Sequence, residues 1–134
     1  MARVRLAAGR GQVLVEAAVV LPLLLLVALA LVQFALVVHA HGVVLGAVQD
    51  GARVAAAADR SLGEGIDHAQ AVLLAGLGSS ARVDVSGSQS PSGSPEVVEV
   101  TAVAYLRPIV PWRNGATIPV GARAAVSKER FRAR

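Results

Sequence analysis

Hydrophobic residues run almost without interruption through the N-terminal third of the chain. Between Ala17 and Val38 the single polar residue is Gln33. As a helix this segment is about 33 Å long, which is enough to cross a hydrocarbon core of about 30 Å. Because lipid offers no partner for backbone polar groups, the segment is helical if it lies in a bilayer. The pattern predicts one transmembrane helix over about 17–38.

Beyond this run the apolar positions keep a helical period of three and four residues, while polar residues fall on another arc. The apolar positions are Val44, Val48, Ala52 and Ala55, and the polar positions are Gln49, Asp50 and Arg53. We therefore predict one long helix from about residue 13 to about residue 58. Pro22 removes one helical hydrogen bond, a break that transmembrane helices tolerate.

The remaining residues predict a small head of one helix and three antiparallel strands. The sequence SLGEG at 61–65 reads as a turn, with Ser61 and Glu64 at capping-box spacing, and an amphipathic helix follows at about 66–77. Alternating apolar residues predict strands at 81–85, 98–106 and 118–126. A Ser-, Gly- and Pro-rich loop occupies 86–95, and Asn114-Gly115 supplies a turn. One face of such a sheet needs a cover from the helices. The predicted fold class is α+β.

Charge suggests an orientation and excludes some partners. Arg3, Arg5 and Arg10 precede the apolar segment, which predicts a cytoplasmic N-terminus and an extracytoplasmic head at 59–134. The formal net charge is +4, but the basic residues gather at the two ends of the chain, so nucleic acid is not an expected partner. Because the chain has no cysteine, the head must hold together by packing or by assembly.

The residues that could carry chemistry do not form a catalytic or metal-binding pattern. On a helix, the rings of His39 and His41 point about 200° apart, so the pair and His68 make a poor metal site, and interfacial polar residues are the simpler reading. The serines of 86–94 have no partnered base, and Trp112 beside Arg113 reads as a loop anchor or an oligomer contact. We expect no enzymatic activity, no cofactor and no small-molecule substrate.

Glycines mark possible sites of close helix packing. Gly42 and Gly46 form a small-xxx-small pair that lets another helix approach, although such spacing also arises by chance in an Ala-, Gly- and Val-rich segment. Gly51 in the helix interior costs about 1 kcal/mol relative to Ala. Its presence indicates close packing or a break at that point.

Glu16 at the head of the apolar run needs an explanation. A charge at membrane depth costs roughly 2.5–3.5 kcal/mol even on lenient insertion scales. A cleaved secretory signal, with the sequence ALA at 28–30 as its cleavage site, is one alternative. It is disfavoured by an acidic residue in the apolar core, and cleavage there would expose residues 31–38 as an apolar tail.

Residues 9–58 combine Arg10-Gly11-Gln12, Val15-Glu16, an early Pro22 and Gly51-Ala52-Arg53. This combination resembles the N-terminal half of TadE-like proteins, the minor pilins or pseudopilins of tight-adherence (Flp-type) type IV pili. These proteins show an Arg-Gly-Gln start, a Val-Glu pair, an early Pro and a Gly-Ala-Arg segment that ends the helix.

The resemblance implies a pilin-like fold and cleavage after Gly11 by a prepilin peptidase. Residues 1–11 would be a cytoplasmic leader, Gln12 the new N-terminus, and Glu16 and Pro22 assembly residues in the long helix at 12–58. Implied partners are the membrane, the peptidase, major and minor pilins and the pilus assembly platform, in a system for adhesion. Three alternatives stay open: Glu16 snorkels at the interface, the protein is an unprocessed membrane-anchored domain, or it is a secreted binding module.

Overall fold

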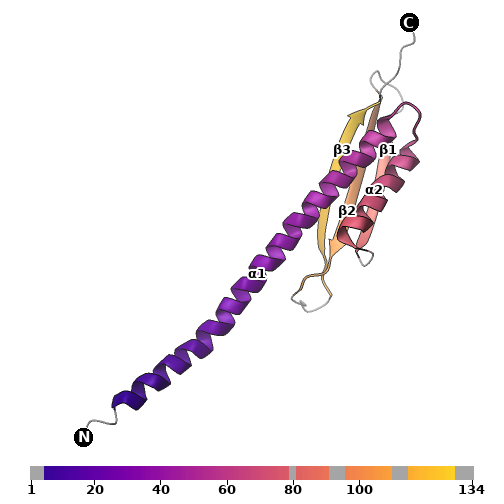
Figure 1. Ribbon diagram of the computed structural model, residues 1–134. Helices are drawn as coiled ribbons and strands as arrows, with labels where there is room; N and C mark the ends of the chain where they lie inside the picture. The colour runs from indigo at the N-terminus through magenta and orange to yellow at the C-terminus, as the bar shows by residue number, and fades with distance from the viewer. Residues whose placement is uncertain (1–4, 79–80, 91–95, 110–114, 129–134) are drawn as a thin grey trace. The chain divides into compact units, whose positions relative to one another are not determined.

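The computed structural model describes residues 5–78, 81–90, 96–109 and 115–128, with side chains from residue 11 onward. Two helices are followed by three strands, in the order α1, α2, β1, β2 and β3 (Figure 1). The chain divides into two compact units, residues 1–35 and residues 36–134. Helix α1 contributes residues to both units.

Helix α1 spans Arg5–Ala56 and contains Pro22 within it. It ends close to the predicted residue but begins earlier than predicted, because the good helix formers Leu6, Ala7 and Ala8 continue the helical pattern toward the N-terminus. Its segment Gly11–Ala56 is long and apolar enough to cross a membrane. The most apolar window of this segment has a mean hydropathy of 2.8, and none of that window is buried.

Helix α2 spans Leu62–Leu77 and begins with a complete capping box. The Ser61 hydroxyl accepts a hydrogen bond from the Glu64 backbone N–H, at 3.2 Å, and the Glu64 carboxylate accepts one from the Ser61 backbone N–H, at 2.8 Å. The prediction of a turn over 61–65 was therefore wrong. The reciprocal cap satisfies two backbone donors that a helix start otherwise leaves open, so these residues form the first turn of the helix.

Strands β1 (Arg82–Gln89), β2 (Val97–Leu106) and β3 (Ile118–Ser127) form an antiparallel sheet in the order β1-β2-β3. β1 runs four residues into the segment predicted as a loop, because residues 86–89 pair in register with residues 98–101 of β2. Gly115 has the predicted positive φ, 63°. Residues 91–95, Pro111, Trp112, Arg113 and Asn114 lie outside the described residues.

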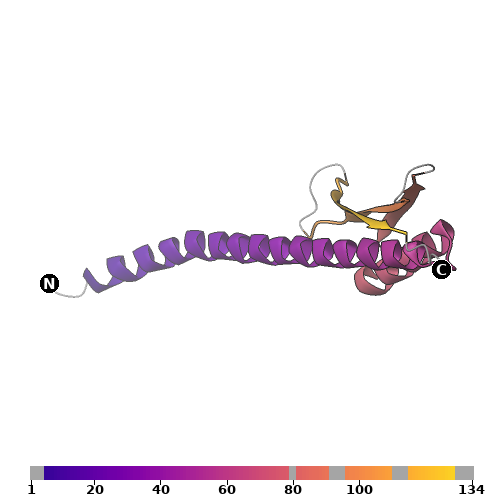
Figure 2. The same cartoon turned by 90° about the horizontal axis from the view of Figure 1, so that it is seen from above.

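The core of the second unit lies between the sheet and the helices. Figure 2 shows the sheet as one layer and α2, with the second half of α1, as the other. The buried cluster that joins them consists of Val44, Ala47, Val48, Ala52, Ala69, Leu73, Val100, Ala102, Ala104 and Val120. Both helices therefore cover the apolar face of the sheet, and the predicted α+β fold is confirmed.

Candidate functional site

The residues predicted for processing and assembly lie on the exposed part of α1. Gly11 and Gln12 are helical and exposed, and Glu16 lies one turn after Gln12. One side of the helix here carries a shallow, open depression lined by Gly11, Gln12, Val15, Glu16, Val19 and Val20. A Cβ atom built on Gly11 would meet no atom within 4 Å. This surface is open to a partner molecule.

Glu16 is a carboxylate in an otherwise apolar helical surface. Val15, Val19 and Val20 around it are each exposed, by 68%, 68% and 42%. Among the side chains that the structure describes, none forms an ion pair with Glu16; the described ion pairs are Asp50–Arg53 and Arg60–Glu64. Without a partner, this charge would be costly at membrane depth.

Pro22 lies inside α1 without ending it. Its ring nitrogen has no hydrogen to donate, so the helical bond to the carbonyl of Ala18 is absent. The surrounding apolar side chains are exposed, among them Leu21 at 64% and Leu23 at 60%. Pro22 therefore leaves one carbonyl acceptor on the surface of the apolar helix.

Gly42 and Gly46 do not pack within the chain. A Cβ atom built on either glycine would have no neighbour within 4 Å among the described residues. The use of this pair for a neighbouring helix stays a prediction.

The close helix contact lies elsewhere, between α1 and α2. A Cβ atom on Gly51 would lie 2.8 Å from the Ala69 Cβ, and one on Gly65 would lie 2.5 Å from the Ala55 Cβ. Gly51 thus marks close packing rather than a break. Sequence reasoning missed Gly65, although Gly51-xxx-Ala55 and Gly65-xxx-Ala69 carry the same small-xxx-small spacing.

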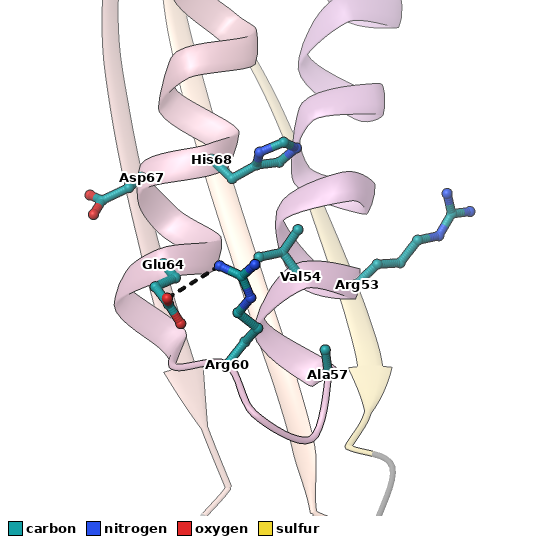
Figure 3. Close-up of a pocket in the computed structure, with 7 residues that line it drawn as sticks. All are labelled: Arg53, Val54, Ala57, Arg60, Glu64, Asp67 and His68. Atoms are coloured by element: carbon teal, nitrogen blue, oxygen red, sulfur yellow. Dashed lines mark hydrogen bonds and ion pairs between the residues drawn. The ribbon is translucent and has the colours of Figure 1, made fainter.

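A pocket of about 710 Å³ lies where α1 gives way to α2, lined by Arg53, Val54, Ala57, Arg60, Glu64, Asp67 and His68. Figure 3 shows that Arg60 reaches Glu64, whereas Arg53 and Asp67 point away from it. The Arg60 Nη1 atom lies 3.3 Å from Glu64 Oε1, and the Arg53 Nη1 atom lies 3.4 Å from Asp50 Oδ1. The pKa of Glu64 lies below its ordinary value, chiefly because the Ser61 backbone N–H binds the carboxylate. These charges serve the local structure of the helix ends.

The three histidines lie in two helices. His39 and His41 are exposed on α1, and His68 is exposed on α2 in the pocket of Figure 3. No group of three or more metal-binding side chains occurs within the described part of the chain.

The exposed apolar part of α1, with Glu16 near its start, agrees with one comparison. Residues 11–53 match the family described as TadE-like protein. This confirms the predicted resemblance, and the match covers Gly11, Glu16, Pro22 and Gly51 through Arg53. The TadE-like family is a pilin-type structural family, not an enzyme family. A comparison with curated proteins and another with solved structures find no match.

Proposed function

We propose that this protein is a TadE-like minor pilin or pseudopilin that takes part in the assembly of a tight-adherence type IV pilus. In this function the N-terminal helix first anchors the subunit in the cytoplasmic membrane, with the N-terminus in the cytoplasm. The same helix then packs against other pilin subunits. The head would remain outside the cytoplasm.

One observation carries the proposal. The family match begins at Gly11, the residue predicted to precede the cleaved bond, and it ends at Arg53, close to the end of α1. The segment that resembles the family thus contains most of the part of α1 that packs against the head and also the exposed apolar part of α1. A pilin needs this surface twice, because lipid covers it before assembly and neighbouring helices cover it afterwards.

We further propose that a prepilin peptidase cleaves after Gly11. Cleavage would remove Arg3, Arg5 and Arg10 and expose the amino group of Gln12 one helical turn from Glu16. In the assembled bundle, the Glu16 carboxylate would pair with the new amino group of a neighbouring subunit. Removing either member of such a buried pair leaves an uncompensated charge, at a cost of about 3–5 kcal/mol.

The mature N-terminus tests the cleavage step. The full chain is co-expressed with its prepilin peptidase and analysed by mass spectrometry. We expect a start at Gln12 in the native chain and an intact leader in Gly11→Leu. Gly9→Leu is the matched control, because it places the same side chain two residues earlier and should leave cleavage at Gln12 unchanged.

The role of Glu16 is tested separately from cleavage. Glu16→Gln keeps the size of the side chain and removes its charge. We expect normal cleavage and loss of the subunit from the assembled pilus fraction. A start at Met1 or Ala2 in every sample would instead support an unprocessed membrane-anchored domain, and a soluble product starting near Leu31 would support a secreted module.

A further inference from the structure

One end of the head carries two exposed arginines, a half-buried tyrosine and an exposed isoleucine. Arg82 begins β1 and pairs in register with Tyr105 near the end of β2, and the guanidinium carbon of Arg82 lies 5.7 Å from the centre of the Tyr105 ring. Arg82, Tyr105, Arg107 and Thr117 line a pocket of about 380 Å³. Two residues after Arg107, Ile109 is 46% exposed. We call Arg82, Tyr105, Arg107 and Ile109 the basic end of the head.

The basic end lies beside the part of α1 that leads into the apolar run. Near the C-terminus of α2, a Cβ atom on Gly76 would lie 2.6 Å from a methyl group of Val43. Arg82 follows the end of α2 after a short link, and Val37, Leu77 and Leu106 pack against the same core. In Figure 1 the end of β2 and the start of β3 lie at this end of the second unit.

The position of Val43 sets the depth of the basic end relative to a membrane. The predicted apolar span ends at Val38, so Val43 lies about 7.5 Å further along the helix axis. The headgroup layer on each side of the hydrocarbon core is about 5–7 Å thick. Val38 and Val43 both belong to the second unit, so the basic end of that unit lies near the outer edge of the headgroup layer at the point where the predicted span ends.

The charges of the head are arranged unequally between its two ends. Arg53 and Arg60, at the opposite end, form ion pairs with Asp50 and Glu64. Glu96 and Glu99 also lie at that end, beside the start of β2. At the basic end, the described carboxylate closest in sequence to Arg82 is Asp84, which lies on the same face of β1. Neither Arg82 nor Arg107 forms an ion pair with a described side chain.

We propose that the basic end of the head docks onto anionic lipid headgroups of the membrane that holds α1. Arg82 and Arg107 bind lipid phosphates, Tyr105 lies at the interface, and Ile109 enters the boundary with the acyl chains. Arginine binds phosphate through several donors in a planar fork, and tyrosine prefers the membrane–water interface. This inference rests on the membrane anchoring in the proposed function. It would hold the unassembled subunit on the membrane surface.

Single cysteines test the docking, because the natural chain has none. Leu26→Cys, Ile109→Cys and Ser88→Cys are labelled with a fluorophore in the full chain. The chains are reconstituted in phosphatidylcholine vesicles with or without an equal part of phosphatidylglycerol. We expect quenching at position 26 by a nitroxide deep in the acyl chains, quenching at 109 by a headgroup nitroxide, and little quenching at 88, which lies at the opposite end of β1.

The arginines are tested in the same vesicles. In the presence of phosphatidylglycerol, Arg82→Gln and Arg107→Gln should each lower the ratio of docked to undocked heads about fivefold. Arg123→Gln on β3 is the matched control and should have a smaller effect, because Arg123 pairs with Thr101, further from the basic end. Circular dichroism of each variant checks that the head remains folded.

The two proposals fail in different ways. If the label at 26 is quenched but the label at 109 is quenched no more than the label at 88, the docking inference is overturned and membrane anchoring stands. If the label at 26 is not quenched, anchoring fails and docking fails with it. Equal quenching at 109 with and without phosphatidylglycerol would overturn the assignment of anionic lipid headgroups as the ligand.

Discussion

The backbones of Gly51 in α1 and Gly65 in α2 approach each other directly. A Cβ atom built on Gly51 would lie 2.7 Å from the Gly65 carbonyl oxygen, and one built on Gly65 would lie 2.5 Å from the Gly51 carbonyl oxygen. Any other side chain would force the helices apart, since a backbone oxygen cannot turn aside as a flexible side chain can. This contact sets how closely the two helices of the head pack.

Alanine at Gly51 should destabilise the head by about 1–3 kcal/mol through overpacking. Thermal unfolding of the full chain in detergent micelles, followed by circular dichroism, measures the loss. Gly46→Ala is the matched control in the same helix, because its Cβ would meet nothing within 4 Å. The control should gain up to about 1 kcal/mol from helix propensity. Equal effects of the two substitutions would contradict the close contact.

Leu73→Ala should destabilise the head by about 2–5 kcal/mol, because it leaves a cavity in the core. The Leu73 side chain is fully buried, whereas the neighbouring Leu74 is 37% exposed. Chemical denaturation in micelles compares the two residues, and Leu74→Ala should cost distinctly less. A cost for Leu74→Ala as large as that for Leu73→Ala would mean that α2 presents a different face to the sheet.

Ser61→Ala should cost about 1 kcal/mol, since it removes the side-chain acceptor at the start of α2. Ser61→Asp supplies another acceptor at the N-cap and should restore most of the loss. The melting temperatures of the three chains give the comparison. If the melting temperature of Ser61→Asp equals that of Ser61→Ala, the N-cap is not the cause of the stability difference.

Glu64 should make the stability of the head depend on pH in the acidic range. Its folded-state pKa is below the ordinary value of 4.5, chiefly because of the Ser61 backbone N–H. A lowered pKa adds stability above the ordinary value and loses it as pH falls through the folded-state pKa. The melting temperature of the native chain should therefore exceed that of Glu64→Gln at pH 7, and the difference should shrink toward pH 3. A constant difference would exclude this carboxylate as the source.

Gly42→Leu and Gly46→Leu should leave the melting temperature of the head nearly unchanged and reduce its incorporation into pili. Both positions are open within the chain, so a bulky side chain is costly only where another helix approaches. The measurement is the amount of subunit in the sheared pilus fraction. Gly63→Leu in α2, where a Cβ would make only an ordinary 3.8 Å contact with the Ser61 hydroxyl oxygen, is the control and should assemble normally. Normal assembly of all three variants would mean that the Gly42 and Gly46 pair is a chance spacing.

Much of the fold could be predicted because it depends on local patterns. The uninterrupted apolar run predicted the long helix, and period-two alternation predicted three strands, of which the second and third closely match β2 and β3 and the first covers only the start of β1. The boundaries were less certain where a local signal competed with pairing or capping. Residues 86–89 look like a loop by composition, yet the register with β2 extends the strand through them.

The residues of the candidate site also fall into those that the sequence reveals and those that only the structure reveals. Gly11, Glu16 and Pro22 were found from the sequence because a charge, a glycine and a proline stand out in an apolar helix, and no tertiary contact is needed to notice them. The sequence alone could not show which glycines pack closely against a helix. Gly42-xxx-Gly46 and Gly51-xxx-Ala55 have equivalent spacing, and only the rotation of α1 against α2 decides which pair is covered.

The sequence by itself determined the apolar helix, the basic N-terminal flank, the order of the elements and the α+β class, because each follows from side chains close together along the chain. The tertiary structure decided which glycines bring the helices together and where Arg82, Tyr105 and Arg107 meet. These relationships depend on strand register and on helix packing, which join residues far apart in the sequence through backbone geometry and buried surface.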